Sequence, residues 1–348
     1  MGNAVKINLG ISMGDPNGVG LEIILKVFED RRMFDFFTPI LFAPHSVVQF
    51  HKNHFNINIS LQLCKGLNKL NKGKLNVVDV ETEDHQTHFG TVASSAGKCA
   101  VDSLLVATKA LKEEQIDALV TAPIHKQSIQ SETFTFPGHT QFLAKELQGD
   151  ALMLMLSDQL RIALVTDHIP VKEVSATINA ELLTAKANQF YQSLQEDFGL
   201  PKPKIAVLGM NPHAGDAGVI GDEDDTVLRP VLQEFQEKGK LIYGPYAADS
   251  FFGSGNVHQF DGVLAMYHDQ GLIPFKTLAF GNGVNYTAGL NKVRTSPDHG
   301  TAYEIAGKGV ADITSFKEAI FSGITIFKNR KMNQKLRSNP LLKQSKKR

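Results

Sequence analysis

The segment VKINLGISMGDPNGVGLEIILKVF (residues 5–28) decides the class of fold. Its first nine residues are rich in isoleucine and leucine, which predicts a buried strand, and the apolar positions of VGLEIILKVF (19–28) recur with a helical period. A glycine-rich loop joins the two. A strand that leads through a tight loop directly into a helix is the repeating unit of α/β proteins.

The same alternation continues along the chain, with no internal repeat and no low-complexity segment. Its 348 residues are enough for two domains or for one large α/β unit. The predicted elements after the first pair are strands at 38–43, 75–80, 117–123, 151–156, 161–166, 204–210 and 262–267, a helix at 101–114, and a helix that places Leu183, Ala187, Phe190 and Leu194 on one face.

Composition excludes several classes of protein. The 36 basic residues balance 36 acidic ones, which argues against binding to nucleic acid or to an anionic membrane, and the basic C-terminal cluster LLKQSKKR (341–348) is interpreted as a solvated tail. No apolar run approaches the ~20 residues of a membrane span. Cys64 and Cys99 form no CxxC pattern, and no signal peptide is present, so we expect a cytoplasmic protein.

Three histidines follow directly after predicted buried strands. They are His168 in RIALVTDH, His213 in KIAVLGMNPH and His268 in GVLAMYH. Ligands of α/β sheets bind outside the carboxyl ends of the strands, so these imidazoles are expected to converge there, and imidazole is a preferred ligand of zinc-like ions. Asp269, beside His268, would orient an imidazole, relay a proton or cap the turn.

A second group of residues is suited to binding anions. In FPGHTQFLAKEL (136–147), His139 and Thr140 open a predicted helix, whose free N–H groups favour a phosphate or a carboxylate, although the segment could also be a simple helix cap. Lys276, Asn285 and Arg294 follow the third histidine strand and add a point charge, an amide and a planar guanidinium. Near a metal ion, they indicate a doubly anionic substrate.

Two glycine-containing segments suggest a nucleotide less strongly. SMGDPNGVGLEI (12–23) matches neither GxGxxG nor the P-loop pattern, and a tight turn before a helix explains it equally well. DHGTAYEIAGKG (298–309) is predicted to start a helix at His299 and Gly300 and to end it at Gly307 and Gly309, so that its backbone donors could face a cofactor.

These motifs together resemble a known family. SMGDPNGVGLE, TAPIHK, FPGHT, TDHIP, NPHAGD, MYHDQGLIPFK, GVNYTAGL and RTSPDHGTAYEIAG resemble, in order and spacing, the signatures of the PdxA family, the 4-hydroxythreonine-4-phosphate dehydrogenases of pyridoxal phosphate biosynthesis. The resemblance extends over about residues 5 to 325. It implies a two-domain α/β fold like that of the isocitrate and isopropylmalate dehydrogenases, in a homodimer. The first domain would comprise residues 1–125 and about 280–348, and the second about 126–279, with the active site between them and at the dimer interface.

The resemblance also implies roles for the residues named above. His168, His213 and His268 would bind one divalent ion (zinc, cobalt, magnesium or manganese) shared between two subunits. The substrate would contact His139, Thr140, Lys276, Asn285 and Arg294. Asp269 and Lys276 are the predicted catalytic residues. NAD or NADP would lie against His299 and Gly300. Departures from the family pattern occur at Gln141, His125, Asp167 and Ser250, and they bear on the hydrogen bonds around the polar groups of the substrate.

The activity implied is NAD-dependent oxidation of 4-phosphooxy-L-threonine at C3. The product is a β-keto acid, which decarboxylates to 3-amino-2-oxopropyl phosphate on the way to pyridoxal 5'-phosphate. Two alternatives remain open. One is a dehydrogenase of a four-carbon sugar-acid phosphate such as erythronate or threonate 4-phosphate, and the other is a phosphate acyltransferase of the same fold. The three strand-end histidines argue against the second alternative.

Overall fold

The strand and the helix predicted from the opening segment are both present. β1 (Ile7–Ser12) is buried along nearly its whole length, and α1 (Gly20–Val27) buries all but one of its residues. Strands that are covered on both faces need apolar residues at successive positions, which is why β1 lacks a strict polar alternation. The structure is a computed structural model and describes residues 6–83 and 85–338; Val5 and the basic C-terminal cluster lie outside the described residues.

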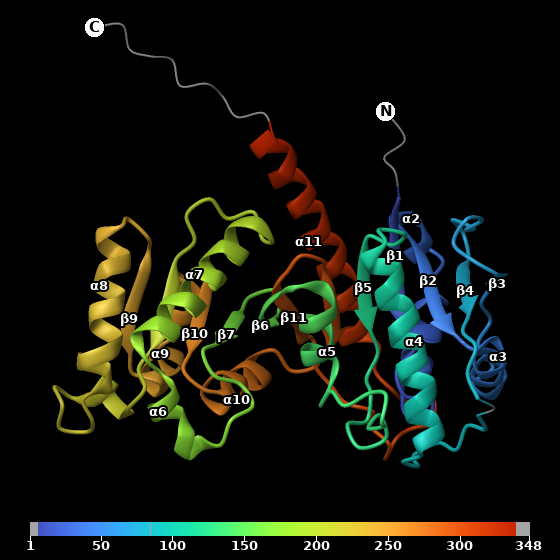
Figure 1. The fold of residues 1–348 in the computed structure, drawn as a ribbon, viewed down its shortest axis with the longest axis horizontal. Coiled ribbons are helices and arrows are strands. Elements are labelled where there is room, and N and C mark those ends of the chain that lie inside the picture. The colour runs from blue at the N-terminus through green and yellow to red at the C-terminus, as the bar shows by residue number, and fades with distance from the viewer. Residues whose placement is uncertain (1–5, 84, 339–348) are drawn as a thin grey trace, which may run out of the picture.

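Twelve strands form one mixed sheet that runs through the whole molecule (Figure 1). Their order is β3-β4-β2-β1-β5-β12-β11-β6-β7-β10-β8-β9. Both ends of the sheet are parallel, whereas the pairs β12–β11, β11–β6 and β6–β7 in its middle are antiparallel. The remaining strands are β2 (Phe37–Ala43), β3 (Leu61–Cys64), β4 (Leu75–Asp79), β5 (Ala118–Thr121), β6 (Gly149–Leu156), β7 (Arg161–Leu164), β8 (Ile205–Leu208), β9 (Ile242–Tyr246), β10 (Gly262–Ala265), β11 (Val284–Leu290) and β12 (Arg294–Pro297).

Helices cover both faces of this sheet, as expected for an α/β fold. In Figure 1, α4 lies in front of the strands at one end, and α11 runs behind the middle of the sheet. The helices after α1 are α2 (Met33–Phe36), α3 (His45–His54), α4 (Ser94–Lys112), α5 (His139–Leu147), α6 (Val174–Thr177), α7 (Ala180–Glu196), α8 (Arg229–Glu237), α9 (Ala248–Gly253), α10 (His268–Leu278) and α11 (Thr314–Ser338).

The hydrophobic core differs between the two faces. On one face a single cluster extends from Leu9 of β1 to Val207 of β8. On the other face the core is divided into one cluster around Phe42 and Leu143 and another around Ile162. The gap between these two clusters leaves the middle of the sheet free to carry polar side chains.

Two sequence predictions need correction. Residues 298–309 do not form a helix: they make a series of turns, in which Ala302 has a left-handed φ of 45° and Gly307 one of 79°. Successive residues of opposite handedness cannot share a helix. The β11–β12 hairpin was not predicted as a pair of strands, because its polar residues Asn285, Thr287 and Arg294 break the apolar pattern.

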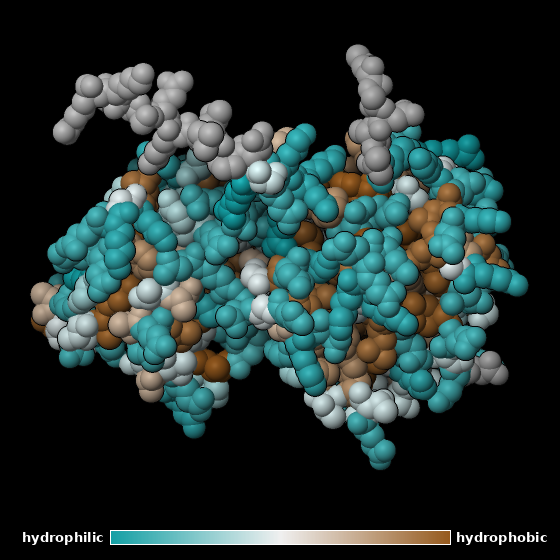
Figure 2. Space-filling view, turned by 45° about the horizontal axis from the view of Figure 1, so that its top comes forward, coloured by the Kyte–Doolittle hydropathy of each residue, from teal (hydrophilic) through white to brown (hydrophobic). Residues whose placement is uncertain are grey.

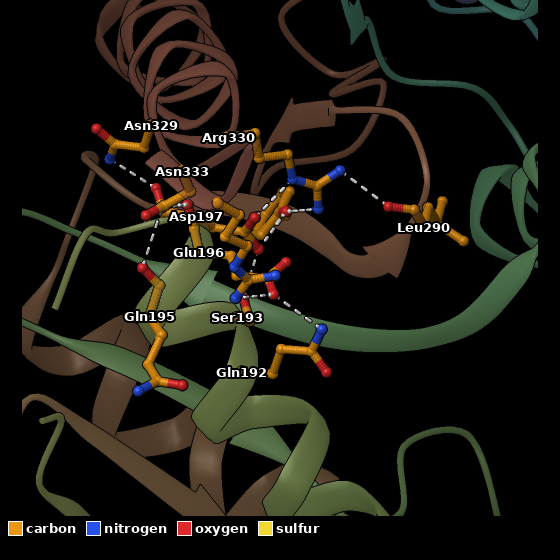
Figure 3. Close-up of polar contacts among 11 residues, drawn as sticks. Gln192, Ser193, Gln195, Glu196, Asp197, Leu290, Asn329, Arg330 and Asn333 are labelled. Atoms are coloured by element: carbon orange, nitrogen blue, oxygen red, sulfur yellow. Dashed lines mark hydrogen bonds and ion pairs between the residues drawn. The ribbon is translucent and has the colours of Figure 1, made fainter. Parts of the chain in front are cut away.

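A buried polar cluster lies behind β11, on the face with the continuous core. Arg330 of α11 donates from Nε to Asp197 (2.6 Å), from Nη2 to the Tyr286 hydroxyl (2.7 Å) and from Nη1 to the Leu290 carbonyl (2.9 Å). The Tyr286 hydroxyl donates to the same Asp197 carboxylate (2.7 Å). Figure 3 shows Arg330 and Asn329 reaching from one helix toward Asp197. We call Asp197, Tyr286 and Arg330 the rear cluster; it joins α7, β11 and α11.

Hydrophilic side chains predominate on the face that Figure 2 shows, and hydrophobic ones occupy separate areas of it. Within residues 6–83 and 85–338, no helix combines the length and the hydrophobicity that a bilayer span requires.

Candidate active site

A cavity of about 630 Å³ lies on the face where the core is divided. Helices α5 and α10 both contribute to its wall, and Figure 1 shows them near the middle of the molecule on the same side of the sheet. The cavity brings together most of the residues predicted from the sequence, although they come from distant parts of the chain. Those that line it are His139, Thr140, His168, His268, Lys276, Asn285, Arg294, His299 and Gly300.

Arg294 is the most unusual of these residues. It is only 2% exposed, and Nε and Nη2 of its guanidinium donate to the Thr121 hydroxyl (3.0 and 2.6 Å), while Nη1 donates to the Thr287 hydroxyl (3.2 Å). No carboxylate among the described residues forms an ion pair with it. Burial lowers the pKa of Arg294 to about 9, because the charged form is removed from water without a counter-charge. The cavity therefore contains a positive charge that an anionic ligand would neutralise.

Two neighbouring polar groups also lack partners. The side-chain oxygen of Asn285 and Nε2 of His139 are buried, and neither has a hydrogen-bond partner among the described residues. Burial, and secondarily the charge of Arg294, holds the pKa of His139 well below its usual range, so the ring is neutral at pH 7. Buried polar groups are normally hydrogen-bonded, so these two groups are available to a polar ligand or to water in the cavity.

The remaining wall is electropositive. α5 begins at His139, so its free N–H groups and the positive end of its dipole lie at the cavity, together with Gly138 and Thr140. The cationic side chains of the lining are Lys126, Lys276 and Arg294, and its one carboxylate is that of Asp298. This balance favours a ligand with more than one negative charge.

His168 and His268 lie side by side at one end of the cavity, with ring centroids 5.8 Å apart. Nδ1 of His268 is 2.8 Å from an Asp269 oxygen, and Nδ1 of His168 is 3.4 Å from an Asp167 oxygen. Hydrogen bonding to His168 lowers the pKa of Asp167 to about 2. With each Nδ1 facing a carboxylate, Nε2 of each ring is left available for a metal ion, which is the usual arrangement of metal-bound histidines. The orienting role considered for Asp269 agrees with this contact.

His213 does not join this pair. It is exposed, it does not line the cavity, and it adopts a left-handed conformation (φ 55°) at the start of a run of positive-φ residues. Among the residues that the structure describes, no three histidine, cysteine or acidic side chains are placed to hold a metal ion together. One chain thus brings together two of the three predicted ligands.

The segment predicted to face a cofactor borders the same cavity. His299 and Gly300 line it, and Nε2 of His299 is buried without a partner within the described chain. Tyr303 anchors this segment by donating its hydroxyl proton to the buried Asp15 carboxylate (2.7 Å). Gly18 lies so close to Thr301 that an added Cβ would be 2.8 Å from its carbonyl oxygen. The glycine-rich loop therefore has a packing role beside this wall.

The sequence analysis missed Thr121 and Thr287, which hold the Arg294 guanidinium. Thr121 lies near the end of the predicted strand at 117–123, which was the one signal available, but the criterion applied to the three histidines selects residues directly after a strand and therefore did not include it. Thr287 gave no such signal, because the hairpin strand that carries it was not recognised. Lys126 and Asp298 of the cavity wall were not predicted from the sequence either.

These features define the class of protein: an α/β enzyme with a cavity suited to a small, multiply charged anion. The family model of the pyridoxal phosphate biosynthetic protein PdxA matches residues 35–322. The chain is 47% identical to the 4-hydroxythreonine-4-phosphate dehydrogenase of Bacteroides thetaiotaomicron, over 97% of this chain and 94% of that protein. It is 34% identical to a putative D-threonate 4-phosphate dehydrogenase of Oceanobacillus iheyensis, over 91% and 97% of the two chains.

Solved structures agree with these matches. A crystal structure of 4-hydroxythreonine-4-phosphate dehydrogenase from Klebsiella pneumoniae superposes with a TM-score of 0.81 at 32% identity, covering 93% of this chain and 99% of that one. The α/β prediction and the family resemblance are both confirmed. The chain belongs to the PdxA family of pyridoxal phosphate biosynthetic proteins.

Proposed function

We propose that this chain is a 4-hydroxythreonine-4-phosphate dehydrogenase. It would oxidise 4-phosphooxy-L-threonine at C3 with NAD or NADP, and the resulting β-keto acid would decarboxylate to 3-amino-2-oxopropyl phosphate. Family membership and the name of the Bacteroides thetaiotaomicron relative support the activity. The observation that carries the proposal is the buried Arg294, whose charge has no counter-ion among the described residues, in a cavity of suitable size.

The residues of the cavity would bind and orient the substrate. Arg294 and Lys276 supply the charges for its phosphate and carboxylate, and the α5 N-terminus adds backbone donors at His139 and Thr140. Asn285 supplies a buried amide oxygen that needs a donor, which the substrate amine provides. Fixing both anionic ends leaves C3 little rotational freedom, which promotes hydride transfer by proximity and orientation.

The histidine pair fits a divalent ion. His168 and His268 offer two neutral nitrogen donors oriented by Asp167 and Asp269, which suits zinc or cobalt and also permits magnesium or manganese if substrate oxygens complete the set. When bound, such an ion would supply Lewis acidity at the alcohol oxygen and, after oxidation, at the ketone oxygen during loss of CO2.

The metal site would be completed in a homodimer. Because His213 does not meet His168 and His268 within one chain, we propose that the three-histidine set is shared between two subunits. The helix α10, which begins at His268, exposes the apolar side chains of Ile273 and Leu278. Phe280 follows two residues after this helix and is 90% exposed. A second copy packed on α10 would cover these side chains and bring a third histidine close.

The cofactor would lie along the wall formed by His299 and Gly300, where it would accept the hydride from C3. We further propose two lobes, residues 1–125 with about 280–348 and residues about 126–279, with the cavity between them. The division of the core on this face supports them. Both cysteines are free and buried, which agrees with a reducing, cytoplasmic environment.

A second candidate substrate is a four-carbon sugar-acid phosphate, because the Oceanobacillus iheyensis relative is named for D-threonate 4-phosphate. It would use the same anion contacts and differ at C2, where a hydroxyl replaces the amine.

The test is NADH formation with 4-phosphooxy-L-threonine, D-threonate 4-phosphate and D-erythronate 4-phosphate, each before and after chelation of divalent ions. Chelator-sensitive turnover of the amino substrate is expected, and a preference for either sugar acid would assign the second function. His213→Ala is expected to abolish turnover in a folded protein. Arg294→Lys is expected chiefly to raise KM, because lysine lacks the planar fork of arginine.

A further inference from the structure

The Arg294 guanidinium is held entirely by uncharged oxygens. A guanidinium has five N–H groups. Three of them, one on each nitrogen, are donated to two hydroxyls: Nε and Nη2 to Thr121, and Nη1 to Thr287. The remaining two N–H groups, one on each terminal nitrogen, have no partner among the described residues.

The strand order explains why both hydroxyls reach this arginine. β12, which begins at Arg294, lies between β5 and β11 in the sheet. β5 ends at Thr121 on one side, and β11 carries Thr287 on the other. Both threonines are essentially fully buried. Because a β-branched side chain has few rotamers, each hydroxyl is a fixed acceptor.

We infer that Thr121 and Thr287 are positioning residues, which fix the guanidinium plane of Arg294 so that its two free N–H groups form a fork for one oxyanion of the substrate. The inference rests on the proposed function only for the identity of that substrate. It does not depend on the metal ion or on the cofactor.

Because hydroxyls and not carboxylates hold Arg294, its charge and its two free N–H groups remain available to an anionic ligand. A carboxylate would orient the guanidinium equally well, but it would also neutralise the charge and compete with the ligand for the fork. A hydroxyl accepts hydrogen bonds without cancelling the charge. The lowered pKa of Arg294, about 9, is consistent with a guanidinium that has geometric support without electrostatic compensation.

The two threonines contribute unequally. Thr121 accepts two N–H groups, the shorter at 2.6 Å, whereas Thr287 accepts one at 3.2 Å. We therefore expect Thr121 to have the larger effect on ligand binding.

The test uses replacements that keep the shape of the side chain. Thr121→Val replaces the hydroxyl with a methyl group, and Thr121→Ser keeps the hydroxyl. A matched control is Thr295→Val: Thr295 is a buried threonine on the same strand as Arg294, and its hydroxyl donates to the Ala319 carbonyl (2.7 Å) and does not contact the guanidinium. Binding is measured by calorimetry on the purified full-length chain without nucleotide, with inorganic phosphate and separately with L-threonine, which carries the carboxylate but no phosphate.

Thr121→Val is expected to weaken binding of one of these two probes about tenfold, which corresponds to ~1.4 kcal/mol, and the affected probe identifies the anion that Arg294 holds. KM for the phosphorylated substrate is expected to rise by a similar factor, with kcat changing less. Thr121→Ser and Thr295→Val are expected to stay within about twofold of the native protein, because the first keeps the acceptor hydroxyl and the second removes a hydroxyl that does not contact the guanidinium.

Unchanged affinity of Thr121→Val for both probes would overturn the inference, and so would a loss in Thr121→Ser as large as that in Thr121→Val. If Thr121→Val does not fold, Thr287→Val provides the same test with an expected loss of about fivefold, or ~1 kcal/mol, from one hydrogen bond. A protein whose probe binding depends on Thr121, but which turns over none of the four-carbon phosphates, would refute the proposed function and leave this inference intact.

Discussion

Arg294 and Arg330 are both largely buried arginines, and they lie on opposite faces of the same part of the sheet. Arg330 forms an ion pair with Asp197 and also donates to the Tyr286 hydroxyl and the Leu290 carbonyl. Its side chain is 17% exposed. Arg294 is more deeply buried, and its guanidinium donates only to hydroxyls within the part of the chain that the structure describes. The pKa of Arg330 is raised, in spite of burial, by Tyr286 and the Asp197 carboxylate, whereas that of Arg294 is lowered by burial alone.

The difference is between a buried arginine with a counter-charge and one that has none among the described residues, which fits the proposed ligand-binding role of Arg294. A buried charge is tolerated when a counter-charge and hydrogen bonds compensate for lost hydration. The rear cluster meets this condition within the protein and joins α7, β11 and α11. Arg294 has no such counter-charge within the described chain, and under the proposed function the substrate would supply it. β11 serves both sites, because successive side chains point to opposite faces: Tyr286 to the rear, Asn285 and Thr287 to the cavity.

The largest expected effect is on stability at the rear cluster. Arg330→Met should lower the free energy of unfolding by about 3–5 kcal/mol, because it leaves the Asp197 carboxylate buried without a cation. Urea denaturation measures it. Lys335→Met removes the same charge from an exposed position of the same helix and should cost less than about 0.5 kcal/mol. Equal effects of the two variants would refute the structural role of Arg330.

At the cavity the same substitution should affect activity instead. Arg294→Met should reduce kcat/KM at least about a hundredfold, or ~2.7 kcal/mol, because an anion contact is lost. The free energy of unfolding should change by no more than about 1 kcal/mol, since relief of an unpaired buried charge offsets the lost hydrogen bonds. Steady-state kinetics and urea denaturation on one preparation measure both. A stability loss as large as that of Arg330→Met would contradict the distinction drawn here.

Tyr286→Phe tests whether the two faces of β11 act independently. The hydroxyl that donates to Asp197 and accepts from Arg330 is lost, while the ion pair between them remains. We expect a stability loss of about 1–2 kcal/mol, typical of a hydrogen bond to a charged group. KM should not change, because the Tyr286 side chain lies on the face opposite the cavity. A marked rise in KM in a well-folded variant would show that the two faces of β11 are coupled.

The smallest effect concerns pH. The pKa of His139 is lowered in the folded chain, so below about pH 6.5 the unfolded chain takes up a proton that the folded chain does not. This part of the stability is complete above about pH 6.5 and declines as the pH falls, by at most about 1.4 kcal/mol per pH unit. The buried His51, whose pKa is also lowered, adds to the same trend.

Arg294→Met should make this decline smaller, because the guanidinium charge contributes to lowering the pKa of His139. Urea denaturation at about pH 7 and about pH 5 measures the difference, with His139→Asn as the reference in which the His139 contribution is absent. A decline in Arg294→Met as steep as in the native protein would exclude a close electrostatic contact between Arg294 and His139.

The sequence predicted strands correctly where successive side chains are all buried and apolar. β1, β8 and β10 are buried on both faces, so their apolar runs are unambiguous. The hairpin of β11 and β12 was missed for the opposite reason: its polar residues are buried by their role in the cavity. The segment at 298–309 was assigned wrongly because composition does not reveal the left-handed φ of Ala302.

The family, most of the alternation of strands and helices, and nine of the residues that line the cavity were predictable from the sequence, because motifs, strand ends and helix starts are local features. Whether a buried charge has a counter-charge beside it depends on the tertiary structure. The sequence predicted a substrate contact at Arg294, but it did not show that Arg330 has a counter-charge and Arg294 has none within the described chain. That difference arises from neighbours far along the chain: Thr121 at Arg294 and Asp197 at Arg330. The energy of a buried charge depends on what surrounds it in space, and the sheet order sets those surroundings.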